Sequence, residues 1–364
     1  MKKLIFGITG LTLGGAERVL VDIANKLSQN YEVTIFTIYS KGILEKQLLP
    51  QVKVKSIFKK EYNELTKLQK KVIIPLKILL QKNKIYKKFI KKQYDIEVAF
   101  LEGPITRIFS CKGKTKKIAW IHNDITQVFG QGLKAKIKKK IDKNIYNKYN
   151  KLIFVSNDNL KKFENQYGSQ IAVPKQVIYN YIDAERVKLK SEEEIEKLET
   201  NSFVTVARLV PQKAIDRFIK VHAELIKEGY NHEVYVIGEG PEKPRLEELI
   251  KKLNVEKTFK LLGKKENPYP YIKQADYFCL FSKFEGYGMV IEEAKILEKN
   301  ILITNTAAVE AIQDYKKAKV FENTHEGIKK GIKGILTKNE EVERKTKTYD
   351  NKNIISEIIK VFED

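Results

Sequence analysis

The sequence predicts an α/β protein built from two Rossmann-like, doubly wound domains that face a central cleft. Short apolar runs typical of buried strands alternate with helical periods, which is the pattern of βαβ units around a parallel sheet. The same rhythm restarts after residue 200, and 364 residues are enough for two domains. In such sheets ligands bind outside the carboxyl ends of the strands, so the loops that directly follow strands are the expected places of chemistry.

The expected N-terminal domain covers residues 1–183. Its strands are predicted at 3–8, 33–38, 52–57, 96–100, 117–121, 152–155 and 176–179. Its helices are predicted at 19–27, 65–90, 133–149 and 160–167, with a kink in the long second helix at Pro75.

The expected C-terminal domain covers residues 201–340 and follows a polar, acidic linker at 184–200. Its strands are predicted at 203–207, 234–237, 258–262, 277–281 and 301–304, and its helices at 214–227, 245–253 and 290–297. A helical tail at 341–364 is expected to pack back on the N-terminal domain.

Composition favours a cytosolic globular chain. Hydrophobic residues make up 42% of the sequence, yet no apolar run approaches the ~18 residues that a membrane-spanning helix needs. The stretch at 4–16 is broken by glycines and ends at Glu17 and Arg18, so we expect neither a signal peptide nor an anchor. Cys111 and Cys279 are far apart and lack metal-ligand spacing, which favours reduced core thiols and no metal site.

Charge is unevenly distributed. The net charge is +23, and residues 1–183 hold 36 basic and 14 acidic residues against 33 and 32 in the remainder. A lysine-rich composition alone would bias both halves, so the asymmetry indicates an anionic partner for the first half. Nucleic acid and an acidic membrane surface are the two candidates.

Two loops offer glycines and one offers a pair of cations. Gly14 and Gly15, between the first strand and first helix, allow a close approach of the backbone to an anion at the helix N-terminus. Arg208 follows a strand and Lys213 precedes a helix, an arrangement that suits a diphosphate. Gly238 and Gly240 again permit close backbone approach. Each pattern alone also fits an ordinary connection or solvated surface cations.

A fourth loop carries two carboxylates. Glu285 follows an expected strand, and Glu293 lies eight residues later on the next expected helix. Carboxylates accept hydrogen bonds from vicinal hydroxyls, so a sugar or a ribose is a suitable partner. The helix start between them offers amides to a phosphate.

These loops together resemble the retaining glycosyltransferases of family 4, which have the GT-B architecture. The matching pieces occur in family order and are GGAER, IHND, VSN, VIYNYID, VARLVPQK, GEGP, NPYPYIKQADYF and EGYGMVIEEA. They cover nearly the whole chain, most closely in its second half and least closely at 40–115.

The resemblance implies site residues. Arg208 and Lys213 would grip the donor diphosphate, Glu293 would bind the donor ribose, and Glu285 would face the transferred sugar as a catalytic residue. The implied donor-binding backbone comprises Gly14, Gly15, Gly238, Gly240, Gly286, Tyr287, Gly288, Met289 and Val290. The second implied catalytic residue is His122, which ends an apolar strand and would lie by the donor sugar. The other histidines, His222, His232 and His325, show no partner in the sequence.

Three positions depart from the family pattern. Proline or serine is common where Gly288 stands and asparagine where Met289 stands, so the identity of the sugar is left open. Glycine is common where Ala214 stands. No cofactor and no metal are expected, because the cations and helix amides would neutralise the leaving diphosphate.

The resemblance implies transfer of a sugar, with retention, from a nucleotide diphosphate sugar, UDP-linked, to a lipid-linked or polysaccharide acceptor in bacterial surface glycan synthesis. Two alternatives stay open, a GT-B sugar-nucleotide epimerase and a non-enzymatic basic protein that binds nucleic acid. No nucleic-acid motif is visible, so nucleic acid is not the expected partner.

The segment Lys67–Lys92 has ten lysines and no acidic residue around an apolar stripe, which favours contact with an anionic membrane surface. The expected location is therefore cytoplasmic, peripheral at the inner face of the cell membrane. The alternative is that the stripe only packs on the sheet beneath it.

Overall fold

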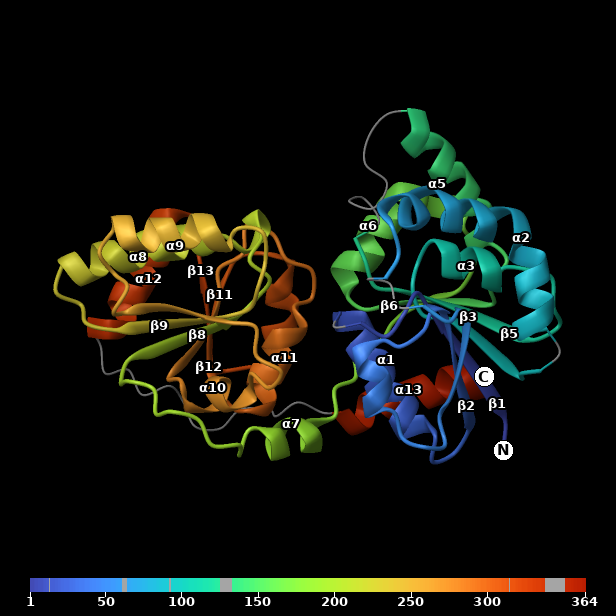
Figure 1. The fold of residues 1–364 in the computed structure, drawn as a ribbon, viewed down its shortest axis with the longest axis horizontal. Coiled ribbons are helices and arrows are strands. Elements are labelled where there is room, and N and C mark those ends of the chain that lie inside the picture. The colour runs from blue at the N-terminus through green and yellow to red at the C-terminus, as the bar shows by residue number, and fades with distance from the viewer. Residues whose placement is uncertain (13, 61–63, 92, 125–132, 314, 338–350) are drawn as a thin grey trace. The chain divides into compact units, whose positions relative to one another are not determined.

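The computed structural model describes all residues except 13, 61–63, 92, 125–132, 314 and 338–350. The chain forms two compact units, one comprising Met1–Ile182 and Lys352–Asp364, the other Asp183–Asn351. Each unit has a parallel sheet with helices on both faces (Figure 1). This confirms the α/β, doubly wound class.

The first unit contains a seven-stranded sheet in the order β3-β2-β1-β4-β5-β6-β7. The strands are β1 Lys3–Ile8, β2 Glu32–Tyr39, β3 Lys53–Phe58, β4 Ile96–Ala99, β5 Lys116–Ile121, β6 Lys151–Phe154 and β7 Lys175–Val177. Every residue from Leu4 to Ile8 is buried, as expected of a central parallel strand covered on both faces.

Helices cover both faces of this sheet (Figure 1). One face carries α2 (Ile74–Phe89), α3 (Pro104–Phe109), α5 (Leu133–Tyr146) and α6 (Asn157–Tyr167), and the other carries α1 (Gly15–Leu27) and α13 (Asn351–Glu363). A π-helical turn, Gln69–Ile73, precedes α2. The π-helical turn runs directly into α2, and Pro75 is the second residue of α2, so the kink expected there stays a prediction.

The second unit contains a six-stranded parallel sheet in the order β10-β9-β8-β11-β12-β13. The strands are β8 Ser202–Val206, β9 Glu233–Ile237, β10 Phe259–Gly263, β11 Tyr277–Leu280, β12 Asn300–Thr304 and β13 Ala318–Phe321. Its helices are α7 Ala184–Lys190, α8 Ile215–Lys227, α9 Lys243–Lys252, α10 Tyr269–Gln274, α11 Met289–Ile296 and α12 His325–Thr337.

One expected boundary differs from the structure. The region 184–200, expected to be a linker, begins with helix α7, which contacts α10 and α11 of the second unit. Of the expected tail at 341–364, residues 341–350 lie outside the described residues. The remainder, α13, belongs to the first unit, where Phe362 packs edge-on against Phe6 and Tyr31 donates a 2.6 Å hydrogen bond to Glu363.

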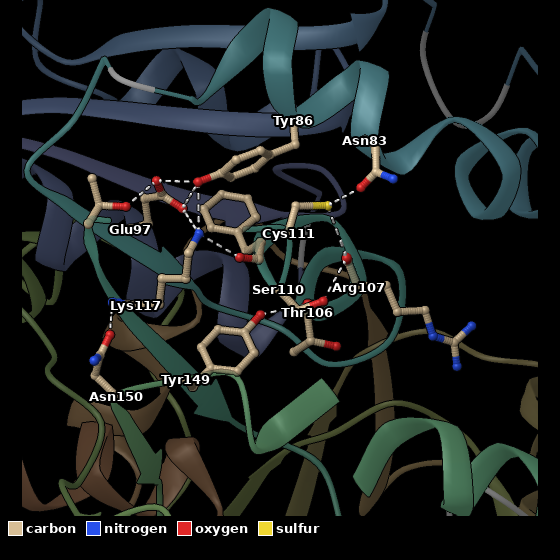
Figure 2. Close-up of polar contacts among 12 residues, drawn as sticks. Asn83, Tyr86, Glu97, Thr106, Arg107, Ser110, Cys111, Lys117, Tyr149 and Asn150 are labelled. Carbon is tan, nitrogen blue, oxygen red and sulfur yellow. Dashed lines mark hydrogen bonds and ion pairs between the residues drawn. The ribbon is translucent and has the colours of Figure 1, made fainter. Parts of the chain in front are cut away.

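A buried polar cluster fastens α2 to the sheet (Figure 2). Lys117 on β5 pairs with Glu97 on β4, and its Nζ also donates to the Tyr86 hydroxyl at 2.9 Å and to the Phe109 carbonyl at 2.8 Å. Tyr86, on α2, donates to Glu97 at 2.8 Å. All three protons of the lysine therefore have acceptors, which a buried ammonium requires. Burial lowers the pKa of Lys117.

Both sheets reverse their strand order beside the first strand of the unit. β1 lies between β2 and β4, and β8 lies between β9 and β11. The carboxyl ends of these strands are the places where doubly wound sheets bind ligands. No helix among the described residues is long and apolar enough to cross a membrane.

Candidate active site

The loops that follow β8 and β11 are joined to each other at this reversal point of the second unit. The Lys283 amide donates to the Gln212 carbonyl at 2.9 Å, and the Gln212 side chain donates to the Phe284 carbonyl at 3.0 Å. Arg217, in the first turns of α8, donates to the Phe281 carbonyl at 2.8 Å. The two loops thus form one structure.

Lys213 and Glu285, both predicted site residues, are brought together by these loops. The Lys213 ammonium forms an ion pair with Oε2 of Glu285, which also accepts a 3.1 Å hydrogen bond from the Ser282 hydroxyl. Their side chains are only 15% and 12% exposed. Arg208 lies in the same β8 loop and is exposed, so its guanidinium can reach an anion from solvent.

The backbone conformation at Ala214 explains why glycine is common at this position in the family pattern. It precedes α8 with φ +51°, in the left-handed region, where a residue with a Cβ is strained by about 1–2 kcal/mol.

Gly238 and Gly240 allow the β9 loop to touch the β8 loop. A Cβ on Gly238 would lie 1.9 Å from the Ala207 carbonyl oxygen, and one on Gly240 would lie 2.2 Å from that of Leu209. The Leu209 amide in turn donates to the Glu239 carbonyl at 3.0 Å. The close approach made possible here is between two loops of the protein; donor binding by these glycines stays a prediction.

Helix α11 begins at the end of the β11 loop. Gly288 precedes it with φ +75°, which disfavours any side chain there. Met289 and Val290 form the first turn, whose amides have no acceptor within the helix. Gly286 is exposed, and a Cβ there would meet nothing within 4 Å. This turn can therefore offer backbone donors to an anion.

Glu293 on α11 is buried, and the Tyr269 hydroxyl of α10 donates to its Oε1 at 3.0 Å. The hydroxyl of Tyr287 donates to the neighbouring carboxylate, Glu292, at 2.5 Å, and Glu292 pairs with Lys295 at 2.9 Å. Burial raises the pKa of Glu292. Of the two predicted carboxylates, Glu293 is thus held by a tyrosine and Glu285 by Lys213 and Ser282.

In the first unit, Gly14 caps α1 and Gly15 is the first residue of that helix. The Glu17 carboxylate folds over Gly14, so that a Cβ there would lie 2.0 Å from its Oε2. Burial raises the pKa of Glu17. No pattern in the sequence predicted a role for Glu17 at this position.

His122 directly follows β5, and its ring packs on the Phe100 ring with centroids 4.5 Å apart. Burial lowers the pKa of His122 to about 3, so the imidazole is neutral at pH 7. Its Nε2 is buried without a hydrogen-bond partner among the described residues.

The backbone that carries His122 is held by Glu102, in the loop after β4. One carboxylate oxygen of Glu102 accepts the amides of His122 at 2.6 Å and of Asn123 at 2.8 Å. The other accepts the Asn123 side chain at 2.7 Å. Asn159, in the first turn of α6, donates to the Asn123 carbonyl at 3.1 Å. Loops after three adjacent strands therefore fix this segment.

Comparison with known proteins identifies the family. A family model described as glycosyltransferase family 4 matches residues 13–186, and one described as glycosyl transferases group 1 matches residues 187–352. The chain is a family-4 glycosyltransferase.

Two relatives of this glycosyltransferase are informative. It is 27% identical to the N-acetylgalactosamine-N,N'-diacetylbacillosaminyl-diphospho-undecaprenol 4-alpha-N-acetylgalactosaminyltransferase of Campylobacter jejuni, over 97% of this chain and 94% of the relative. It is 25% identical to an uncharacterized glycosyltransferase of Methanocaldococcus jannaschii, over 77% of this chain and 70% of the relative.

Solved structures show the GT-B fold of this glycosyltransferase. Anabaena HepE, in complex with UDP and glucose, matches with a TM-score of 0.73 at 17% identity, covering 100% of both chains. S. aureus TarM matches with a TM-score of 0.75 at 15% identity, covering 100% of this chain and 99% of TarM.

Several residues of this glycosyltransferase that hold the site were not predicted from sequence. Glu102, Tyr269 and Glu292 each contact a predicted site residue or its backbone. Glu102 follows a strand next to the reversal point of the sheet, so strand order would have singled it out. Tyr269 and Glu292 lie within the family-like pieces but have no spacing that identifies their partners.

Proposed function

We propose that this glycosyltransferase moves a sugar from a UDP-sugar to a lipid-linked or polysaccharide acceptor of bacterial surface glycan synthesis, with retention of configuration. The observation that carries the donor proposal is the position of Arg208 and Lys213. Both lie in the loop that follows β8, at the reversal point of the sheet, and α8 begins directly after them. Two cations beside a helix N-terminus suit a diphosphate.

The uracil nucleotide and the acceptor class are supported by the relatives. HepE was solved in complex with UDP and glucose, and the Campylobacter jejuni relative is named for a diphospho-undecaprenol acceptor. In this proposal Glu293 takes the ribose, Glu285 the sugar, and His122 with Gly14 and Gly15 lies by the reacting sugar. The cations and the amides at Gly286–Val290 neutralise the leaving diphosphate without a metal ion.

A location at the inner face of the cell membrane is supported by helix α2. Its inner row, Ile74, Ile78, Ile85 and Tyr86, is buried in the first unit. Six large apolar side chains on the segment are 47–74% exposed and form its outer row: Leu68, Val72, Ile73, Leu76, Leu79 and Leu80. Packing on the sheet explains the inner row only, whereas an anionic lipid surface fits apolar side chains among lysines.

Thermal shift with a panel of nucleotides and nucleotide sugars tests the donor proposal without knowledge of the acceptor. A ligand at a hundred times its Kd stabilises the folded chain by about 2.7 kcal/mol, so UDP should raise the melting temperature. Arg208→Ala and Lys213→Ala should reduce this shift while the free protein stays folded. UDP shifts equal to the parent's in both variants would contradict the proposed site.

Product analysis separates the transferase from the epimerase. A transferase leaves a free UDP-sugar unchanged in configuration until an acceptor is added, whereas an epimerase converts the donor by itself. Transfer should also survive EDTA; loss of activity that magnesium or manganese restores would contradict a metal-free mechanism.

A further inference from the structure

Glu285 and Lys213 neutralise each other in the structure, and this ion pair affects which nucleotide can bind. The ion pair is nearly closed off from water, and the Ser282 hydroxyl holds the same carboxylate oxygen at 3.1 Å. The loop-to-loop bonds through Gln212 fix the distance between the two segments. A diphosphate that reaches Lys213 must therefore meet Glu285 as well.

The carboxylate does not disfavour the binding of all uridine nucleotides equally. The terminal phosphate of free UDP is linked only to the neighbouring phosphate and carries more negative charge than the same phosphate esterified to a sugar. A fixed carboxylate beside its binding cation therefore repels UDP more than it repels a UDP-sugar. The sugar in addition brings hydroxyl groups, which can donate hydrogen bonds to the carboxylate once Lys213 has turned to the phosphate.

We propose that Glu285 is a specificity-determining residue that selects the sugar nucleotide over the bare nucleoside diphosphate, by competing with the diphosphate for Lys213. This rests on the proposed function, because it assumes that Lys213 binds the donor diphosphate. The same competition favours release of UDP after transfer, when no sugar remains to occupy the carboxylate.

Isothermal titration of the full chain with UDP tests the proposal. Glu285→Gln keeps the size of the side chain and an acceptor for Lys213 but removes the charge, and UDP should bind about tenfold tighter. The affinity for UMP, which lacks the second phosphate, should rise less in this variant, and the affinity for uridine should not rise. The gain for UDP should shrink in 1 M salt, because salt screens the interaction.

Glu233→Gln is the matched control. Glu233 pairs with Lys260 at 2.7 Å in the same unit but lies at the amino end of β9, opposite the candidate site. The UDP affinity of the Glu233→Gln variant should equal that of the parent. Glu285→Ala is a second variant that should also tighten UDP binding, which keeps the test valid if Glu285→Gln is poorly folded.

The outcomes separate this inference from the proposed function. If the parent binds UDP and both Glu285 variants bind it equally or more weakly, the competition for Lys213 is refuted and the donor site stands. If the parent chain and Lys213→Ala both fail to bind UDP or any nucleotide sugar, the proposed function itself fails, and the inference with it.

Discussion

The carboxylate of Glu102 shows how a single side chain can hold a backbone segment in place. It accepts two successive amides, those of His122 and Asn123, and a side-chain amide besides. Backbone that is fixed by one carboxylate in this way loses its orientation when that carboxylate is removed. Glu102 is therefore a positioning residue for His122 under the proposed function.

Glu102→Ala should lower kcat for sugar transfer by about 10–100-fold with little change in KM for the donor, since misplacement of a reacting group affects the chemical step most. Glu102→Gln retains a carbonyl acceptor for the two amides and should restore most of the activity. The UDP-induced thermal shift serves as the control and should not change. Equal losses in both variants would show that the negative charge, and not the positioning, is required.

Tyr269 makes a comparable contact to Glu293 in the second unit. Tyr269→Phe removes the donor to a buried carboxylate, and a hydrogen bond to a charged group contributes about 1.5–3 kcal/mol. UDP affinity should fall by roughly tenfold in titration calorimetry if Glu293 binds the ribose. Tyr271→Phe, on the same helix, is the control. Unchanged affinity in Tyr269→Phe would show that Glu293 is not oriented by this bond.

Sequence predicted site residues where a charged side chain stands beside glycines or a second charged residue at a strand end or a helix start. Arg208, Lys213 and Glu285 were predicted because each stands at a strand end or helix start, and the structure brings Lys213 and Glu285 together. Glu102 and Tyr269 depend on partners that lie at least 20 residues away in the chain. Such pairings follow from strand order and helix packing, which spacing alone does not specify.

Helices and strands were predictable where their apolar pattern was strong. Most strands were predicted because parallel strands buried on both faces form nearly continuous apolar runs. The edge strand β13 was missed because its pattern is mixed and Val320 is exposed. Helix α12 was missed because it contains three glycines, at positions 327, 331 and 334, which lower helix propensity.

Helix α2 combines a buried row with an exposed one, and the two can be tested separately. The parent chain should sediment with anionic but not neutral vesicles, and salt should weaken the binding, because the Debye length falls from about 10 Å at 0.1 M to about 3 Å at 1 M. Replacing Lys82, Lys84, Lys87 and Lys88 with glutamine should weaken it as well. Lys92, also part of the predicted basic segment, lies outside the described residues.

Substitution of the outer row gives the complementary result. Leu76→Ser and Leu79→Ser together should reduce vesicle binding at any salt concentration, since they remove apolar area that would enter the interface. UDP affinity and the melting temperature should stay near the parent's, because both side chains are exposed. If the parent chain does not sediment with anionic vesicles at low salt, the membrane proposal is refuted.

Helix α8 carries a buried histidine whose partners the sequence did not show. His222 and His232 are hydrogen-bonded at 2.8 Å, and His232 also contacts the Tyr230 carbonyl at 2.8 Å. Since a carbonyl only accepts, Nδ1 of His232 carries a proton, its Nε2 accepts from His222, and His222 accepts from Thr258. Both rings are satisfied as neutral groups. His325, on α12, lies 3.0 Å from the Glu224 carboxylate.

This arrangement predicts a loss of stability in acid. Burial, with a smaller contribution from His232, lowers the pKa of His222 to about 3, and burial lowers the pKa of His232. The unfolded chain takes up protons below about pH 6.5, which the folded chain does not, so stability is full above pH 7 and falls as the pH drops. The lowered pKa of His222 alone should reduce the free energy of unfolding by about 2 kcal/mol at pH 5.

Denaturant unfolding at pH 7 and pH 5 measures this loss. The double variant His222→Leu with His232→Leu should lose less stability between these two values than the parent. In the parent, the NMR signals of the His222 imidazole should not titrate between pH 8 and pH 5, and those of His232 should titrate below the usual range of a histidine. Titration near pH 6.5 would contradict buried neutral rings.

At the scale of the whole molecule, the chain leaves the first unit at Ile182 and returns to it at Lys352. The returning helix α13 buries Ile358, Val361 and Phe362 almost completely. Lys116 on β5 also donates to the Val361 carbonyl at 2.6 Å. The first unit therefore depends on residues that follow the entire second unit in sequence.

Phe362→Ala should destabilise the first unit by about 3–5 kcal/mol, the usual cost of removing a buried aromatic ring. Hydrogen exchange followed by mass spectrometry should show faster exchange in peptides from β1 and α1, whereas peptides from β8 and β9 should be unaffected. Lys360→Ala, at an exposed position of α13, is the control. Faster exchange confined to the second unit would contradict the assignment of α13 to the first.

The return of α13 also fixes the order in which the parts can mature during synthesis. Ribosomes add about 5–20 residues per second, so roughly ten to thirty seconds of translation separate Ile182 from Lys352. During that interval the second unit can complete its own sheet, while the face of β1 that receives Phe362 stays uncovered. The part of the chain that is made first is thus finished last, and a nascent chain halted before residue 352 would present that apolar face to chaperones.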